Sequence, residues 1–246
     1  MGKEGEWHPI SLSESVESGT SAGVQLLGRE LVVWRDSAGA AHTWEDRCPH
    51  RGMRLSFGFV RNDRIACLYH GWQYDTGGQC RYIPAHPDLV VPETIKVPVY
   101  AVREQYGMIW TALEGDPALP FRSEDSDGTV PVRSLYLDCS SNSALDALRT
   151  ASLDPFQQSM VAEAQFRALG GNLYALSNGA HTLVIGIQTI SETRTALHIA
   201  ISGSAKRYAG AGQLHFLRWA NDLRGRALKP AASNLHTAAQ LSAGAR

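Results

Sequence analysis

Features typical of membrane, secreted or nucleic-acid-binding proteins are missing from this 246-residue chain. No apolar run approaches the roughly 20 residues that a membrane-spanning helix needs. The start, Met1 to Glu6, lacks the apolar stretch of a secretory signal. The formal net charge of −1 argues against the strongly basic surface that nucleic acids require. We therefore expect a cytoplasmic protein with neither a membrane nor a nucleic-acid partner.

Cysteine is scarce as well. The chain has four cysteines, which are Cys48, Cys67, Cys80 and Cys139. In a reducing compartment such thiols are metal ligands or packed side chains more often than disulfides. Cys139 has no partner by spacing, and we expect both it and Cys80 to serve in packing.

Two short motifs combine the remaining cysteines with histidines. Cys48-x-His50 is followed, after sixteen residues, by Cys67-x-x-His70. Two Cys and two His could bind one Zn²⁺. Because each loop supplies one thiolate and one imidazole, a pair of like ligands can also face each of two iron ions, as in a [2Fe–2S] cluster. A glycine follows each pair, at Gly52 and Gly71, and allows the backbone to approach the cluster closely.

Residues 42–84 resemble the Rieske domain of aromatic-ring-hydroxylating and O- or N-demethylating non-haem iron oxygenases. The matching stretches are Cys48-Pro49-His50-Arg51-Gly52 and Cys67-Leu68-Tyr69-His70-Gly71-Trp72, and the likeness extends from Trp7 to about Trp110. The extra Cys pair usual in respiratory Rieske proteins is missing, which favours the oxygenase branch. The resemblance implies a mostly β, α+β chain, with a Rieske β-domain followed by a truncated helix-grip domain.

The pattern of apolar runs and turn residues divides the chain into three parts. Residues 7–113 have many short apolar runs between turns and are predicted to form the β-domain. Residues 114–131 are polar and rich in helix breakers, as in an interdomain linker. Residues 132–246 form the second region. Within it we expect a helix over 141–169 interrupted or kinked at Pro155, strands over 183–190 and 195–201, and a helix over 212–228.

The resemblance also implies a second metal site in the C-terminal region. There the family holds a mononuclear iron by two His in the pattern Asp-x-x-His-x-x-x-x-His and by a later carboxylate. Asp146 falls on the leading Asp, which bridges the two metals, but Arg149 and Asp154 replace the two His. A guanidinium cannot bind iron, so these two residues could form an ion pair instead. Asp222 could remain from the carboxylate position or be an exposed helical Asp.

Four other histidines lie in the C-terminal region, namely His181, His198, His215 and His236. None reproduces the spacing of the expected pair, and His198 is predicted to point away from the face of its neighbours Leu197 and Ile199. The region is also short for a domain of this kind. We therefore expect no mononuclear Fe(II) in this chain.

Together these features predict an oxidoreductase component that carries a [2Fe–2S] cluster and transfers electrons. We expect an accessory subunit without its own catalytic iron. Its electrons would come from a flavin- and ferredoxin-type reductase. Its partner would be a catalytic Rieske oxygenase in a trimer-like hetero-oligomeric ring. Two alternatives stay open: an active oxygenase or demethylase of an aromatic or related small organic substrate, and a stand-alone Rieske ferredoxin. The sequence does not identify a substrate.

Overall fold

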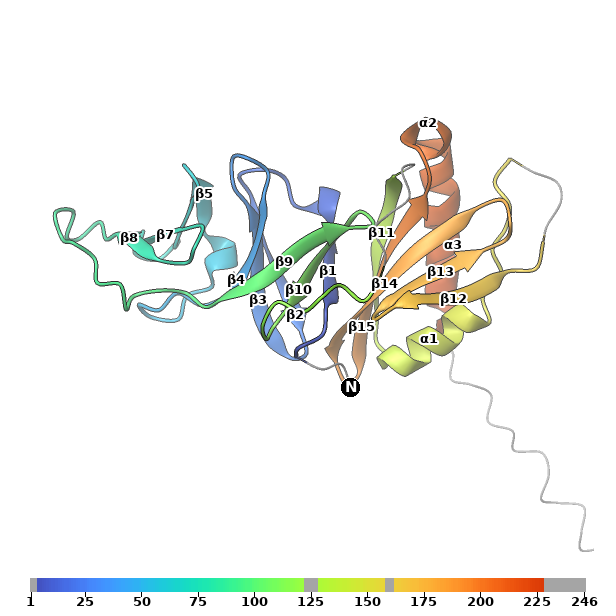
Figure 1. Cartoon of the computed structure of the whole chain (residues 1–246), viewed down its shortest axis with the longest axis horizontal. Coiled ribbons are helices and arrows are strands. Elements are labelled where there is room, and N and C mark those ends of the chain that lie inside the picture. Colours follow the sequence, from blue (N-terminus) through green and yellow to red (C-terminus); the bar gives the residue numbers. More distant parts are fainter. Residues whose placement is uncertain (1–3, 122–127, 158–161, 228–246) are drawn as a thin grey trace, which may run out of the picture.

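The computed structural model describes residues 4–121, 128–157 and 162–227. Three antiparallel sheets follow one another along the long axis, with a four-stranded sheet at one end, a six-stranded sheet in the middle and a five-stranded sheet at the other end (Figure 1). This arrangement confirms the predicted mostly β fold with an α+β C-terminal part. None of the helices that the structure describes is long and apolar enough to cross a membrane.

The six-stranded sheet has the order β1-β10-β9-β4-β3-β2. Its strands are β1 (His8–Leu12), β2 (Ser21–Leu26), β3 (Arg29–Arg35), β4 (Ala41–Glu45), β9 (Val99–Gln105) and β10 (Met108–Ala112). Side chains alternate between the two faces of β3. Val32 and Trp34 pack with Trp44 toward the end sheet, whereas Leu31 and Val33 join a separate core on the other face.

The four-stranded sheet has the order β5-β6-β7-β8. Its strands are β5 (Phe59–Arg61), β6 (Arg64–Ala66), β7 (Gln73–Asp75) and β8 (Cys80–Tyr82). Two 3₁₀ turns, η1 (Ser13–Ser15) and η2 (Leu55–Phe57), connect strands in this half of the chain. Ile65 on β6 and Tyr74 on β7 are fully buried and belong to the same core as Trp34 and Trp44 of the middle sheet. This shared core holds the small sheet against the middle sheet.

The five-stranded sheet has the order β11-β15-β14-β13-β12. Its elements are β11 (Thr129–Leu137), α1 (Ser141–Arg149), β12 (Gln165–Gly170), β13 (Leu173–Ser177), β14 (Thr182–Ser191), β15 (Arg194–Ser202), α2 (Ala205–Tyr208) and α3 (Ala211–Ala227). On β14, Leu183, Ile185 and Ile187 pack in the core with α1 and α3. Val184 and Gly186 face the middle sheet.

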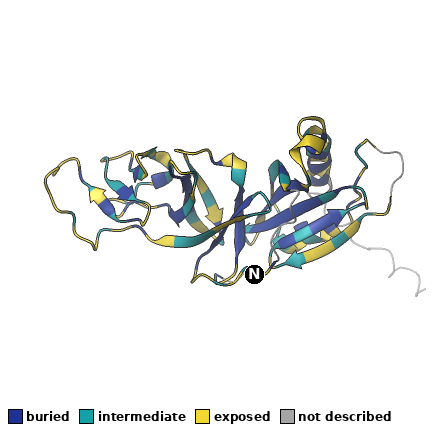
Figure 2. Ribbon diagram, turned by 45° about the horizontal axis from the view of Figure 1, so that its top comes forward, coloured by how far each residue is buried: buried dark blue, intermediate teal, exposed yellow. Residues whose placement is uncertain are grey.

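Close packing joins the middle sheet to the five-stranded sheet, and Figure 2 shows buried residues on both sides of this contact. A Cβ atom at Gly186 would lie 2.8 Å from Met108 Sδ and 2.9 Å from Pro9 Cβ. The turn between β2 and β3 also caps β14, since Leu27 N donates to Thr189 O at 2.9 Å. The two parts therefore form one continuous body.

The prediction of a helix over 141–169 is wrong for much of that range. α1 ends at Arg149, and residues from Gln165 form strand β12 instead. Ser140 caps the start of α1 by accepting a hydrogen bond from Ser143 N. Beyond Thr150, the side chains of Leu153 and Ala151 turn into the core and the chain leaves the helical path before Pro155.

The other elements predicted in the C-terminal region are confirmed. The strands expected over 183–190 and 195–201 correspond to β14 and β15, and the helix over 212–228 corresponds to α3. The last three residues of the expected linker, from Thr129, already belong to β11.

Candidate metal centre

Two loops with the same backbone geometry lie at the end of the molecule that carries the small sheet. In each, a cysteine N–H donates to the carbonyl five residues later, and a glycine N–H donates back to the cysteine carbonyl. The four bonds are Cys48 N to Met53 O, Gly52 N to Cys48 O, Cys67 N to Trp72 O and Gly71 N to Cys67 O, at 2.8 to 2.9 Å. Gly52 and Gly71 have φ of 74° and 68°, where a side chain would strain the backbone.

The thiols of the two loops meet in the interior. Cys48 and Cys67 are only 2% and 3% exposed, and their side chains are within hydrogen-bond reach of each other. Tyr74 Oη lies 3.1 Å from Cys48 Sγ. Burial raises the pKa of the Cys67 thiol and Cys48 raises it further, while the backbone N–H groups of Tyr69 and His70 oppose this by bonding the sulfur. Donors of this kind stabilise sulfur once it carries negative charge.

The imidazoles of the two loops meet nearer the surface. The ring centroids of His50 and His70 are 4.5 Å apart. Trp72 stacks on His50 with centroids 4.4 Å apart and an angle of 6°, and Tyr69 contacts His70 at 3.9 Å. His50 Nδ1 is buried and has no hydrogen-bond partner among the described residues. Burial lowers the pKa of His50, as do His70 and Arg51, and this favours the neutral form of the ring, which is the form that binds metal.

This donor set fits a two-iron centre better than a single ion. Among the residues that the structure describes, no three His, Cys, Asp or Glu side chains surround one metal-ion position. The thiols of Cys48 and Cys67 form one pair and the rings of His50 and His70 form another. A single tetrahedral zinc needs all four donors around one point, whereas a Rieske centre needs a thiolate pair on one iron and an imidazole pair on the other.

A shallow basic groove of about 450 Å³ lies beside the imidazole pair. Its walls include Arg47, Arg51 and Lys96, all of which are exposed. The carboxylate of Glu45, which also lines the groove, accepts a hydrogen bond from Tyr100 Oη at 2.8 Å. The groove therefore presents positive charge next to His50.

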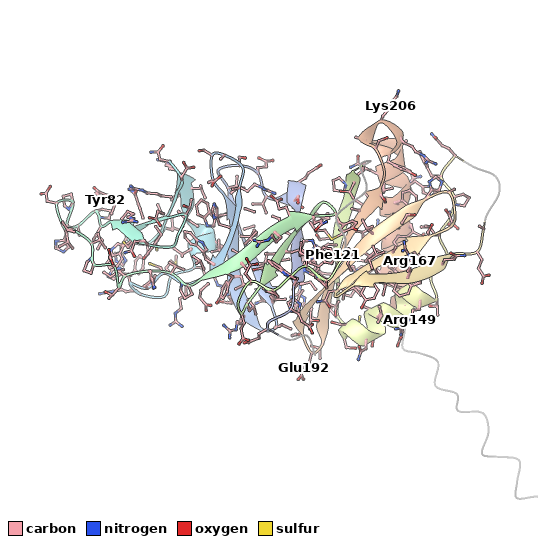
Figure 3. All side chains as sticks on the ribbon, viewed as in Figure 1. Tyr82, Phe121, Arg149, Arg167, Glu192 and Lys206 are labelled. Carbon is pink, nitrogen blue, oxygen red and sulfur yellow. The ribbon has the colours of Figure 1, made fainter. Side chains whose placement is uncertain are left out.

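The residues expected at the second metal site do not converge. Asp146 and Arg149 form an exposed ion pair on α1 with a distance of 3.0 Å between Oδ1 and Nη1. The ion pair considered between Arg149 and Asp154 is not among those of the described residues, where Arg149 pairs with Asp146 and α1 ends before Asp154. Asp222 is exposed on α3. Figure 3 shows Arg149 far along the long axis from Tyr82, which ends β8 in the sheet of the cluster loops.

The other histidines of this half have structural partners. His181 Nδ1 lies 2.9 Å from Tyr208 Oη, and His181 Nε2 accepts from the N–H of Phe156 at 3.1 Å. His215 Nε2 donates to the carbonyl of Asp154 at 3.2 Å. His198 points away from the face of Leu197 and Ile199, as predicted, and bonds Ser134 and Gln188. His236 lies outside the described residues.

Sequence reasoning missed the aromatic support of the imidazole pair and the hydroxyl beside Cys48. Trp72 and Tyr74 lie two and four residues after His70, so a search of the residues next to the motif would have found both. Sequence spacing alone cannot show that one ring stacks on the histidine of the other loop.

Comparisons with known proteins agree with this geometry. A family model for the Rieske [2Fe-2S] domain matches residues 6–101. The chain is 36% identical over 160 residues to the oxidoreductase NdmD of Pseudomonas putida, which covers 61% of this chain and 27% of that protein. It is 38% identical over 130 residues to the methylxanthine N1-demethylase NdmA of Pseudomonas putida, which covers 49% of this chain and 36% of that protein. The chain thus spans about a third or less of these two curated relatives.

The fold is similar to a solved structure of Pseudomonas putida CBB5 NdmA over nearly the whole chain. The TM-score is 0.70 and the sequence identity is 23%, and the match covers 99% of this chain and 85% of that chain. At this identity the likeness shows the fold alone. The five-stranded sheet and its helices therefore share the architecture of the NdmA chain as well as the N-terminal sheets.

Proposed function

Because residues 6–101 are a Rieske [2Fe-2S] domain in a chain related to Rieske non-haem iron oxygenases, we propose that the protein transfers electrons within an oxygenase system. Cys48, Cys67, His50 and His70 hold the cluster, with the thiolates on one iron and the imidazoles on the other. The observation that carries this assignment is the buried, unpartnered Nδ1 of His50 next to a second imidazole. A buried nitrogen without a partner is costly unless a ligand occupies it.

The residues around the four ligands suit a one-electron centre. When bound, a [2Fe–2S] cluster takes up and releases a single electron. Tyr74 Oη and the N–H groups of Tyr69 and His70 donate toward sulfur and so stabilise added negative charge. The exposed side chain of His70 connects the site to solvent, and the groove of Arg47, Arg51 and Lys96 attracts a negatively charged redox partner.

We further propose that the chain is an accessory subunit that lacks its own mononuclear iron. Its electrons come from a flavin- and ferredoxin-type reductase and pass to a catalytic homologue in a trimer-like hetero-oligomer. The supporting observation is that Asp146 is paired with Arg149 on an exposed helix face. Shifting the expected pattern so that Asp154 leads places Gln157 and Ala162 on the His positions. Neither alignment supplies a histidine pair.

A second candidate is an active oxygenase or demethylase of an aromatic or related small organic substrate. The observation in its favour is the match of 99% of this chain to the NdmA structure, which includes the C-terminal sheet and helices. This candidate needs a third iron, held by residues other than those in the two alignments above.

Iron content separates the two candidates. Protein purified without oxygen is analysed for iron and acid-labile sulfide, and its electron paramagnetic resonance spectrum is recorded after reduction. The accessory subunit is expected to hold two irons and two sulfides per chain and to show a Rieske signal. A third iron that survives chelation, with substrate-dependent O₂ uptake by the isolated protein, would establish the oxygenase instead. A missing Rieske signal would refute both.

A further inference from the structure

A pocket of about 750 Å³ lies at the junction of the middle and five-stranded sheets, on the side that carries α1. Strands β13 and β14, the first turn of α1, the β2–β3 turn and the segment before β1 all contribute to it. Figure 3 places Glu192, one of its rim residues, at the tip of the β14–β15 hairpin beside α1. The volume is in the range of small-molecule sites, roughly 300–1,000 Å³. We call it the junction pocket.

Hydrogen bonds between elements hold the walls of the junction pocket in place. Leu27 N and Gly28 N donate to Thr189 O and Ile190 O at 2.9 and 2.8 Å, which joins the β2–β3 turn to β14. Ser141 Oγ lies 2.7 Å from Thr189 Oγ1, which joins α1 to the same strand. Because these three hydrogen bonds tie two elements to β14, the pocket is preformed and a ligand need not order its walls.

The floor of the junction pocket is apolar and its rim is acidic. Leu145, Tyr174 and the buried Ile187 supply the floor. Glu6 and Glu192 are exposed carboxylates on the rim, whereas Glu4 is paired with Arg29 at 3.1 Å. No Lys, Arg or His is among the described residues that line it. A ligand with an apolar body and a positive charge complements both features, and an organic anion is repelled.

We propose that the junction pocket binds a small organic amine, with its apolar part against Leu145, Tyr174 and Ile187 and its ammonium group toward Glu6 and Glu192. The site lies at the junction of the middle and five-stranded sheets, apart from the cluster loops, and does not depend on the electron-transfer function proposed above. A ligand bound there contacts elements of both the middle sheet and the five-stranded sheet, because the walls of the pocket come from both sides of the junction.

Three probes that share one ring and differ in charge test the proposal. Benzylamine, benzyl alcohol and benzoate are titrated into the full, cluster-loaded chain, and binding is followed by ligand-observed NMR. We expect saturable binding in the order benzylamine, benzyl alcohol, benzoate. In the double variant Glu6→Gln/Glu192→Gln, benzylamine affinity should fall about three- to tenfold, as expected for two partly exposed charge pairs, while benzyl alcohol binding is unchanged.

A blocking variant and a charge control make the test specific. Asn142→Trp fills the pocket mouth from an exposed position of α1 and should abolish binding of all probes. Glu17→Gln removes an exposed carboxylate elsewhere and should change nothing. The visible spectrum of the cluster confirms that each variant is folded. Binding that survives Asn142→Trp, benzoate that binds as well as benzylamine, or no binding of any probe would overturn the proposal.

Discussion

A buried histidine near the junction of the sheets makes the folded chain sensitive to acid. His198 on β15 is 0% exposed. Its Nε2 donates to Gln188 Oε1 and its Nδ1 accepts from Ser134 Oγ, both at 2.8 Å. Gln188 Nε2 then donates to the carbonyl of Gln25 in the middle sheet at 2.7 Å. Burial lowers the pKa of His198 to about 3, so the imidazole is neutral in the folded protein.

The sign and size of the effect follow from this pKa. Below its ordinary value of 6.5 the unfolded chain binds a proton at His198, while the folded chain does not until about pH 3. The unfolded state therefore binds more protons across this window, and stability is lost as the pH falls. Between pH 7 and pH 5, His198 alone should lower the free energy of unfolding by about 2 kcal/mol.

Urea unfolding of the cluster-loaded protein, followed by far-ultraviolet circular dichroism at pH 7 and pH 5, measures this loss. His198→Gln keeps a donor toward Gln188 and an acceptor toward Ser134 but does not titrate, so its loss on acidification should be smaller by about 2 kcal/mol. His86→Gln, at an exposed histidine, should lose as much as the unchanged protein. An equal loss in His198→Gln and the unchanged protein would refute the reasoning.

Three further changes test the cluster loops and the junction. Tyr74→Phe should lower the reduction potential by about 40–60 mV in a redox titration, if the bond to Cys48 is worth ~1–1.5 kcal/mol more after reduction; an unchanged potential would show that the hydroxyl does not donate to sulfur. His70→Cys should change the electronic spectrum and lower the potential because an anionic thiolate replaces a neutral ring; if the potential stays the same, His70 is not a ligand. Gly186→Ala should cost about 1–3 kcal/mol of unfolding free energy by overpacking against Met108, whereas Gly225→Ala, with open space around it, should cost nothing.

The candidate cluster site could be read from the sequence because its chemistry is local. Each loop carries one cysteine and one histidine within four residues, and a glycine at positive φ closes each loop. The same short segments therefore specify both the donors and the turns that present them. The contact of Trp72 with His50 could not be read in this way, since it joins the two loops in space.

The C-terminal half was harder to predict because tertiary contacts determine where its first helix ends and which path the chain takes after it. The segment after α1 has few helix breakers, yet it does not continue as a helix. Four hydrogen bonds from distant elements fix its backbone there instead. They are Trp219 Nε1 to Ser152 O, Asn178 Nδ2 to Leu153 O, His215 Nε2 to Asp154 O and Phe156 N to His181 Nε2. Local propensity carries no information about such partners. Strands β14 and β15, by contrast, are long and strongly apolar, and their existence was predicted.

The burial pattern of α1 explains how this half keeps its fold without the expected histidines. Ala144 and Leu148 are completely buried in the core, whereas the side chains of Asp146 and Arg149 are 71% and 56% exposed. One face of this helix thus holds core residues, and the other holds the positions of the expected bridging Asp and of one expected His ligand. Substitutions on an exposed face usually change stability by less than about 0.5 kcal/mol. Residues at these exposed positions can therefore differ from the expected pattern while Gly186 still packs against Met108 and Pro9 of the middle sheet, which is compatible with the proposal that the electrons pass to a metal in another subunit.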